Sequence, residues 1–257
     1  MISSHPEDRS FLQEIASVSG LPLKQEQNVR DAINFINQND KTIIFADVST
    51  QEKYKEIEEA VQSTLGLFSE KVNSNRMHFI SAEDLSKSSY LINSPLFGHY
   101  IARKYGDAAE AGKHYGRIIK MESDDKAFGI EKFFESGVKT QKIKFKETIQ
   151  KQQAVEAVKN YLLAAKFKSR MASVIANAVD ELLMNAMFDA PVDDLGKPIF
   201  NSTSRAEKIK LDGKHAVEMQ IAFDGAYVAV SVSDLFGSLD KNKLLSHIST
   251  RYTDEEY

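Results

Sequence analysis

Two hydrophobic periods alternate along the first hundred residues. Residues 42–48 (TIIFADV) are almost continuously apolar, as buried parallel strands are, and residues 77–80 (MHFI) form a second such run. Weaker strands are predicted at residues 2–4, 21–24 and 90–92. Apolar residues at helical spacing predict helices between these runs, at 6–19, from 29 onward, and from 52 to about 71. This alternation predicts an α/β layer with a parallel sheet over residues 1–105.

The second half has a different pattern. Residues 106–145 read as a helical connector, interrupted by Gly106, Gly112, Gly116 and Gly129. Residues 147–189 are strongly helical, with a break near 167–170 and an end at Ala190-Pro191. Two alternating strands follow at 216–223 and 227–233, joined by a predicted Asp224-Gly225 turn. We therefore expect residues 146–257 to form a separate α+β domain of two layers.

A polar stripe runs along the second of these helices. Asn177, Glu181, Asn185 and Asp189 stand four residues apart, so they share one helical face, while the neighbouring positions are mostly apolar. Such a stripe is either the solvent-exposed face of a surface helix or the lining of a binding site. The spacing alone favours the solvent-exposed face.

Composition narrows the class of protein. The chain has 257 residues, a formal net charge of −4 and no cysteine. Disulfides, thiolate ligands and a cysteine nucleophile are therefore excluded, which suits a cytoplasmic protein. No basic run indicates nucleic acid as a partner. No apolar run approaches the roughly 18 residues of a membrane span, and the first residues lack the features of a signal peptide.

Asp47 lies at the end of the 42–48 strand, at the edge where parallel sheets carry their sites. This position resembles the phosphoacceptor of bacterial response-regulator receiver domains. Ser81-Ala82 and Ser94-Pro95 align with two further receiver positions. The receiver's pair of metal-binding acids is replaced by Ser3-Ser4, and its lysine is replaced by Ser94. The resemblance implies a doubly wound, flavodoxin-like pseudo-receiver over residues 1–105, with Asp47 as a remnant.

The second half also resembles a known family. An E-x-x-x-N helix, a loop, a hairpin and an Asp–Gly turn follow one another through VDELLMNAMFDAPVD and VSVSDLFGSLD. This order is similar to the ATP-binding domain of the GHKL superfamily, which includes histidine kinases and bacterial anti-sigma serine kinases. The resemblance implies that Asn185 binds Mg²⁺, that Glu181 is the catalytic base or polarising group, and that Asp234 accepts a hydrogen bond from adenine.

The predicted nucleotide site also includes Asp189, which is on the same polar stripe, and Gly237, which is in the turn. Physical chemistry agrees, because a neutral amide oxygen suits Mg²⁺ and a strand-end carboxylate can select an amino purine. The turn departs from the usual D-x-G-x-G, since Gly237 stands three residues after Asp234. The sequence stops at Tyr257, before the second glycine-rich loop of the family, so we expect an incomplete domain that binds ATP weakly or not at all.

Three functional hypotheses follow. The first is a bacterial signalling ATPase or protein kinase that uses Mg²⁺ and ATP and acts on a partner protein. The second is a non-catalytic interaction protein, and the third is a structural protein without a nucleotide. His99 and His114 lack the flanking pattern of a phosphorylated histidine, so we expect surface or packing roles for them. The helices of residues 140–170 are candidates for a homodimer interface.

Overall fold

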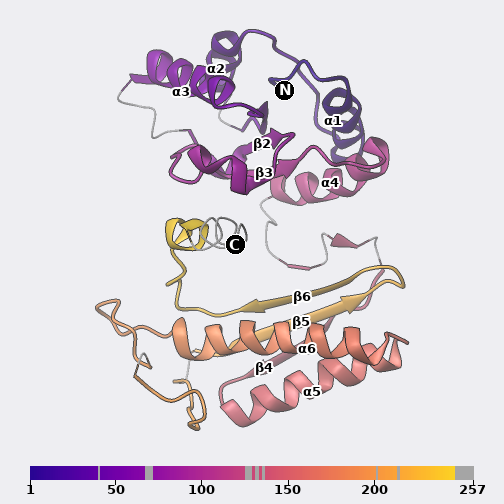
Figure 1. Ribbon diagram of the computed structural model, residues 1–257, viewed down its shortest axis with the longest axis vertical. Coiled ribbons are helices and arrows are strands. Elements are labelled where there is room, and N and C mark those ends of the chain that lie inside the picture. The colour runs from indigo at the N-terminus through magenta and orange to yellow at the C-terminus, as the bar shows by residue number, and fades with distance from the viewer. Residues whose placement is uncertain are drawn as a thin grey trace. The chain divides into compact units, whose positions relative to one another are not determined.

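The computed structural model describes residues 1–39, 41–66, 72–124, 129–130, 133–134, 137–200, 202–212 and 215–246. Its contacts divide the chain into two units, the first made of Met1–Asp125 with Asp240–Tyr257 and the second of Lys126–Leu239. Each unit contains one three-stranded sheet with helices (Figure 1). The mixed α/β class predicted from the sequence is therefore confirmed.

The sheet of the first unit is parallel. Its strands β1 (Ile44–Asp47), β2 (Met77–Ser81) and β3 (His99–Ala102) lie in that order. Ile2 forms a parallel bridge to Ala46 on the outer side of β1. Beyond it, the amino group of Met1 donates to the carbonyl of Lys24, and the Glu26 amide donates to the carbonyl of Met1. The spatial order is thus residues 24–26, residues 1–2, β1, β2 and β3.

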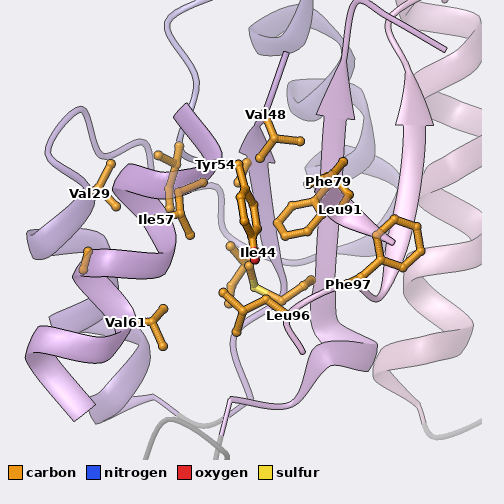
Figure 2. Packing of buried hydrophobic residues seen from close by; sticks show 14 of the residues in the cluster. Val29, Ile44, Val48, Tyr54, Ile57, Val61, Phe79, Leu91, Leu96 and Phe97 are labelled. Carbon is orange, nitrogen blue, oxygen red and sulfur yellow. The ribbon is translucent and has the colours of Figure 1, made fainter. Parts of the chain in front are cut away.

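Helices cover both faces of this sheet because its side chains alternate. Ile44 and Ala46 of β1 join the core beneath α2 (Val29–Gln38) and α3 (Gln51–Leu65), where Figure 2 shows the helical side chains facing Ile44 and Phe79. Phe45, between them, joins the opposite core beneath α1 (Pro6–Ser19) and α4 (Ala108–Ser123). This two-residue alternation is the geometry that a strand requires.

Two predicted strands of the first unit are wrong, because neither residues 21–24 nor residues 90–92 form a strand. After β2 the chain forms two short 3₁₀ helices, η3 (Leu85–Lys87) and η4 (Ser89–Leu91), and residues 90–92 belong to the second of these and its cap, whereas η2 (Ser74–Arg76) precedes β2. A three-residue apolar run has no period that separates strand from helix. Ser94-Pro95 therefore does not follow a strand. The strand beside β2 is β3, whose mixed sequence HYIA gave no strand signal, and Arg103 follows it.

The predicted connector over residues 106–145 is divided between the units. Helix α4 packs along α1 in the first unit, and β4 (Gln141–Phe145) pairs with a strand of the second. Gly112 and Gly116 do not interrupt α4. A Cβ at Gly112 would lie 2.6 Å from the Phe11 carbonyl oxygen, and one at Gly116 would lie 2.8 Å from the Val18 Cβ. These glycines allow two helices to approach closely.

The second unit is an antiparallel sheet with two helices on one face (Figure 1). Strands β4, β5 (Val217–Phe223) and β6 (Val228–Ser233) lie in that order, and α5 (Thr148–Ala164) and α6 (Ser169–Met184) run side by side over them. The break between the helices is at Lys166, whose φ of 66° is left-handed. Buried Lys151 of α5 donates to Asp180 of α6. A π-helical turn, η6 (Asn185–Asp189), continues α6.

The chain returns to the first unit after the second sheet. Residues 241–246 are helical, and Leu245 is buried in the core cluster that contains Phe97. The Lys241 ammonium donates to the Phe97 carbonyl. The sequence predicts this segment to be part of the domain of residues 146–257, whereas its contacts assign it to the first unit. The predicted lid of residues 246–257 lies outside the described residues, apart from Ser246. Over the described parts of the chain, no helix combines the length and apolarity needed to cross a membrane.

The close packing of α4 on α1 makes a prediction with a definite sign. Alanine normally favours a helix over glycine by about 1 kcal/mol. We nevertheless expect Gly112→Ala to lower the free energy of unfolding by about 1–3 kcal/mol, because the added methyl group overpacks the contact with Phe11. Urea unfolding followed by circular dichroism measures the change. Lys113→Ala, on the exposed side of the same helix, is the control and is expected to be near neutral. A stabilised Gly112→Ala protein would contradict the close approach.

Candidate functional site

Four charged side chains meet at the carboxyl edge of the parallel sheet. Asp47 ends β1, Arg103 follows β3, and Asp8 and Lys53 come from the first turns of α1 and α3. The Arg103 Nη2 lies 2.7 Å from the Asp8 Oδ2 and 2.9 Å from the Asp47 Oδ1, while its Nε donates to the Asp8 Oδ1 at 2.8 Å. All three side chains are almost completely buried, with exposed fractions of 0% for Asp8, 5% for Asp47 and 7% for Arg103. The guanidinium therefore bridges two buried carboxylates.

The carboxylate oxygens of Asp47 and Asp8 have further hydrogen-bond and ion-pair partners. The Ser49 hydroxyl donates to the Asp47 Oδ1 at 2.5 Å, and the Lys53 Nζ lies 2.5 Å from the Asp47 Oδ2. The hydroxyls of Ser3 and Tyr105 donate to Asp8 at 2.6 and 2.8 Å. A cavity of about 320 Å³ adjoins the network, lined among others by Ser3, Ser4, Asp47, Lys53 and Glu56. Asp47 thus borders a cavity with both of its oxygens engaged.

Electrostatics keep this network charged. Burial tends to raise the pKa of Asp47, but hydrogen bonds from Lys53, Ser49 and Arg103 outweigh it and bring the pKa down to about 2. Burial opposes the charge on Asp8 as well, yet hydrogen bonds from Arg103, Ser3 and Tyr105 lower its pKa. Burial alone would lower the pKa of Arg103, but the two carboxylates raise it. Two negative charges and a bridging cation are therefore the stable state.

The residue types at this edge do not fit Mg²⁺ in the described arrangement. Mg²⁺ requires oxygen ligands at about 2.0–2.1 Å in a near-octahedral shell. Both oxygens of Asp8 face Arg103, and the guanidinium occupies the space between the carboxylates. Asp8 and Arg103 were both missed in the sequence. In the sequence, Asp8 is one of two acidic residues in the first turn of a predicted helix, which is a common position for an acid. Arg103 follows a strand that the sequence does not predict.

The lowered pKa of Asp47 predicts a pH dependence. Because its folded-state pKa of about 2 lies below the ordinary 3.8, the carboxylate stabilises the fold above about pH 4. This contribution is lost as the pH falls towards 2. Unfolding free energies of the wild type and of Asp47→Asn are expected to differ by about 2 kcal/mol near neutral pH and to converge only as the pH falls through about 2. Asp84→Asn, in an exposed pair with Lys104, is the control with little effect. A difference that does not change with pH would contradict the assignment.

The polar stripe of α6 lies on an exposed face of the second unit. Asn177, Glu181, Asn185 and Asp189 are all exposed. The last two belong to η6, and π-helical turns in helices occur frequently at functional sites. Arg205, from the loop before β5, lies 3.8 Å from a Glu181 oxygen and 3.2 Å from an Asp189 oxygen. No spacing pattern in the sequence pointed to Arg205.

The turn after β6 is attached to the end of this helix. The Asp234 Oδ1 accepts a hydrogen bond from the Phe236 amide at 2.9 Å, and Gly237 has a left-handed φ of 64°. The Ser238 hydroxyl then donates to the carbonyl of Ala190, the residue after η6, at 2.7 Å. The structure therefore brings the Asp234–Gly237 turn to the end of the helix that carries Asn185 and Asp189. Asp47 belongs to the other unit.

The groups at this end of the second unit suit a nucleotide. Asp234 is half-buried, and its Oδ2 makes no hydrogen bond within the described residues, so it can accept one from an adenine amino group. The ring of Phe236 lies 4.4 Å from that of His215, which gives the turn an aromatic component. The exposed Asn185 amide and the Arg205 guanidinium supply a neutral oxygen for Mg²⁺ and a cation for phosphates. These residue types fit Mg²⁺ and ATP.

Comparison with family models, with curated proteins and with solved structures finds no match to this chain. The functional assignment therefore rests on the residues and their geometry.

Proposed function

We propose that this chain is a signalling protein whose second unit binds Mg²⁺ and ATP in the manner of the GHKL superfamily and acts as an ATPase or protein kinase on a partner. One observation carries the proposal. The Ser238–Ala190 hydrogen bond holds the Asp234 turn against the end of the Glu181–Asn185 helix. Two motifs that are some fifty residues apart in the sequence are thereby linked, which supports a shared nucleotide site. The element order β4, α5, α6, β5, β6 supports it further.

Each residue has a definite role in this proposal. Asp234 would accept a hydrogen bond from the adenine amino group, and Asn185 would hold Mg²⁺ through its amide oxygen. Glu181 orients or deprotonates the attacking hydroxyl or water, for which its exposed position leaves room. Arg205, which pairs with Glu181 and Asp189 in this structure, would be the residue that neutralises phosphate charge. Mg²⁺ and ATP together would supply the activated phosphoryl group.

The first unit fits a receiver-like module held in a single state. The three-stranded parallel sheet has helices on both faces, and the contacts of residues 1–2 and 24–26 beside β1 are consistent with the order 2-1-3-4-5 of flavodoxin-like folds, which supports this reading. The Arg103 guanidinium bridges Asp8 and Asp47. This arrangement favours the second hypothesis for the first unit, a domain that binds partners without accepting a phosphoryl group.

Nucleotide binding provides the direct test. Saturation-transfer NMR on the full chain with ATP and Mg²⁺ detects weak binding, and we expect signal transfer to the adenine protons. Asp234→Asn should weaken binding by about tenfold or more, because the amide that replaces the carboxylate adds a donor opposite the adenine amino group. Asn185→Ala should reduce only the Mg²⁺-dependent part of the affinity.

Two controls are available: a substitution on the same helix face, and a nucleotide that lacks the adenine amino group. Asn177→Ala, two turns earlier on the same face of α6, should leave binding unchanged. GTP, which lacks the adenine amino group, should bind more weakly than ATP. If millimolar ATP gives no signal with the wild type, the nucleotide hypothesis fails and the interaction hypothesis remains.

The state of Asp47 can be tested separately. An acyl phosphate donor with Mg²⁺ is expected to leave the intact mass of the protein unchanged, because Arg103, Ser49 and Lys53 already engage both Asp47 oxygens. Asp47→Asn is the matched control for the site of any modification. A phosphoryl adduct on the wild type that is absent from Asp47→Asn would show that the first unit is a competent phosphoacceptor.

A further inference from the structure

Two histidines lie side by side on the first unit's sheet, towards the amino ends of β2 and β3 and two residues before the level of Asp47. His78 of β2 and His99 of β3 are directly paired in the parallel register. Their rings stack with centroids 4.2 Å apart and an angle of 5° between the planes. Glu122, in the last turn of α4, faces both imidazoles. One helix and two neighbouring strands therefore contribute to a single His–His–Glu cluster.

The polar atoms of this cluster are poorly satisfied by one another. The His78 Nε2 lies 3.5 Å from the Glu122 Oε2, and both atoms are buried without a hydrogen-bond partner among the described residues. The His78 side chain is 0% exposed. Leaving a buried donor or acceptor unpaired costs about 1–3 kcal/mol. A buried nitrogen and a buried carboxylate oxygen that face each other in this way are suited to a shared cation.

We propose that His78, His99 and Glu122 bind one zinc ion. Tetrahedral zinc with bonds of about 2.0–2.1 Å places neighbouring ligand atoms roughly 3.3 Å apart. The His99 Nε2 lies 3.2 Å from the Glu122 Oε1, and the His78 Nε2 lies 3.5 Å from the Oε2. The candidate ligand atoms all lie within 4.8 Å of one another. The two stacked rings would have to turn relative to each other so that both nitrogens and the carboxylate face one ion.

The surroundings of the cluster support this choice of ion. Two imidazoles and a carboxylate favour zinc over Mg²⁺ or Ca²⁺, which prefer oxygen ligands alone. The Tyr115 hydroxyl oxygen lies 3.3 Å from the His78 Nδ1 and can accept its N–H. This contact would favour the tautomer whose Nε2 has a lone pair for the metal, as the outer partners of zinc-bound histidines do. His99 is 39% exposed, so a fourth ligand can reach the ion from solvent.

One competing contact must be given up, because the His99 Nε2 also lies 2.9 Å from the Asn75 carbonyl oxygen. That carbonyl lies at an exposed position where water can replace the imidazole.

Zinc titration of the full chain tests the proposal. The protein is first stripped with a chelator, and zinc is then added in competition with a chromophoric chelator. We expect one tight equivalent in the wild type and a rise in the melting temperature on binding. His99→Asn and Glu122→Gln change partly exposed side chains and should each weaken binding by about tenfold or more, without the melting shift. Circular dichroism confirms that both variants are folded.

A histidine outside the cluster serves as the control. His114→Asn, on the same helix as Glu122, should bind zinc as the wild type does. The proposal is overturned if the wild type takes up no tight zinc equivalent, or if His99→Asn and Glu122→Gln bind zinc as tightly as the wild type. None of these outcomes depends on nucleotide binding by the second unit.

Discussion

The bridge from Arg103 to Asp8 and Asp47 organises the first unit. It joins the start of α1, the end of β1 and the end of β3 through one buried guanidinium. Desolvation of these charges is costly, and only their close and complete pairing offsets it. Arginine suits this place, because its planar fork binds Asp8 through two nitrogens and still reaches Asp47. The position of α1 on the sheet edge thus depends on charge pairing as well as on apolar packing.

The sequence predicted the parts of the fold whose signal is local. The apolar strand at 42–48, the capped helices and the hairpin after residue 216 each carry their pattern within a few residues. Strands β3 and β4 were missed, because HYIA mixes polar and apolar residues and QKIKF is rich in lysine. The bridge between Asp8 and Arg103 joins residues 95 positions apart, so no local pattern could reveal it. The sequence predicts that Gly112 and Gly116 interrupt a helix, but they lie inside α4. Their role depends on the close contact with α1, which is distant in sequence and gives no local signal.

The two proposed functional regions differ in how their charges are used. At the sheet edge of the first unit, every carboxylate oxygen has a buried or close partner, so a ligand would have to displace an existing ion pair. On α6 and η6 of the second unit, Glu181 and Asp189 are exposed and lie near one exposed arginine. Exposed pairs of this kind contribute little to stability, so they can open at little cost. A closed charge network suits a fixed scaffold, and an open one suits binding.

The return of residues 241–246 to the first unit has a consequence for how the protein is made. Leu245 completes a core cluster whose other members all come from residues 2–97. The second unit is continuous in sequence and is translated in full before Leu245 is added. The first unit, although it leaves the ribosome earlier, therefore cannot bury its whole core until the second has been synthesised. Its final packing step is timed by the translation of its neighbour.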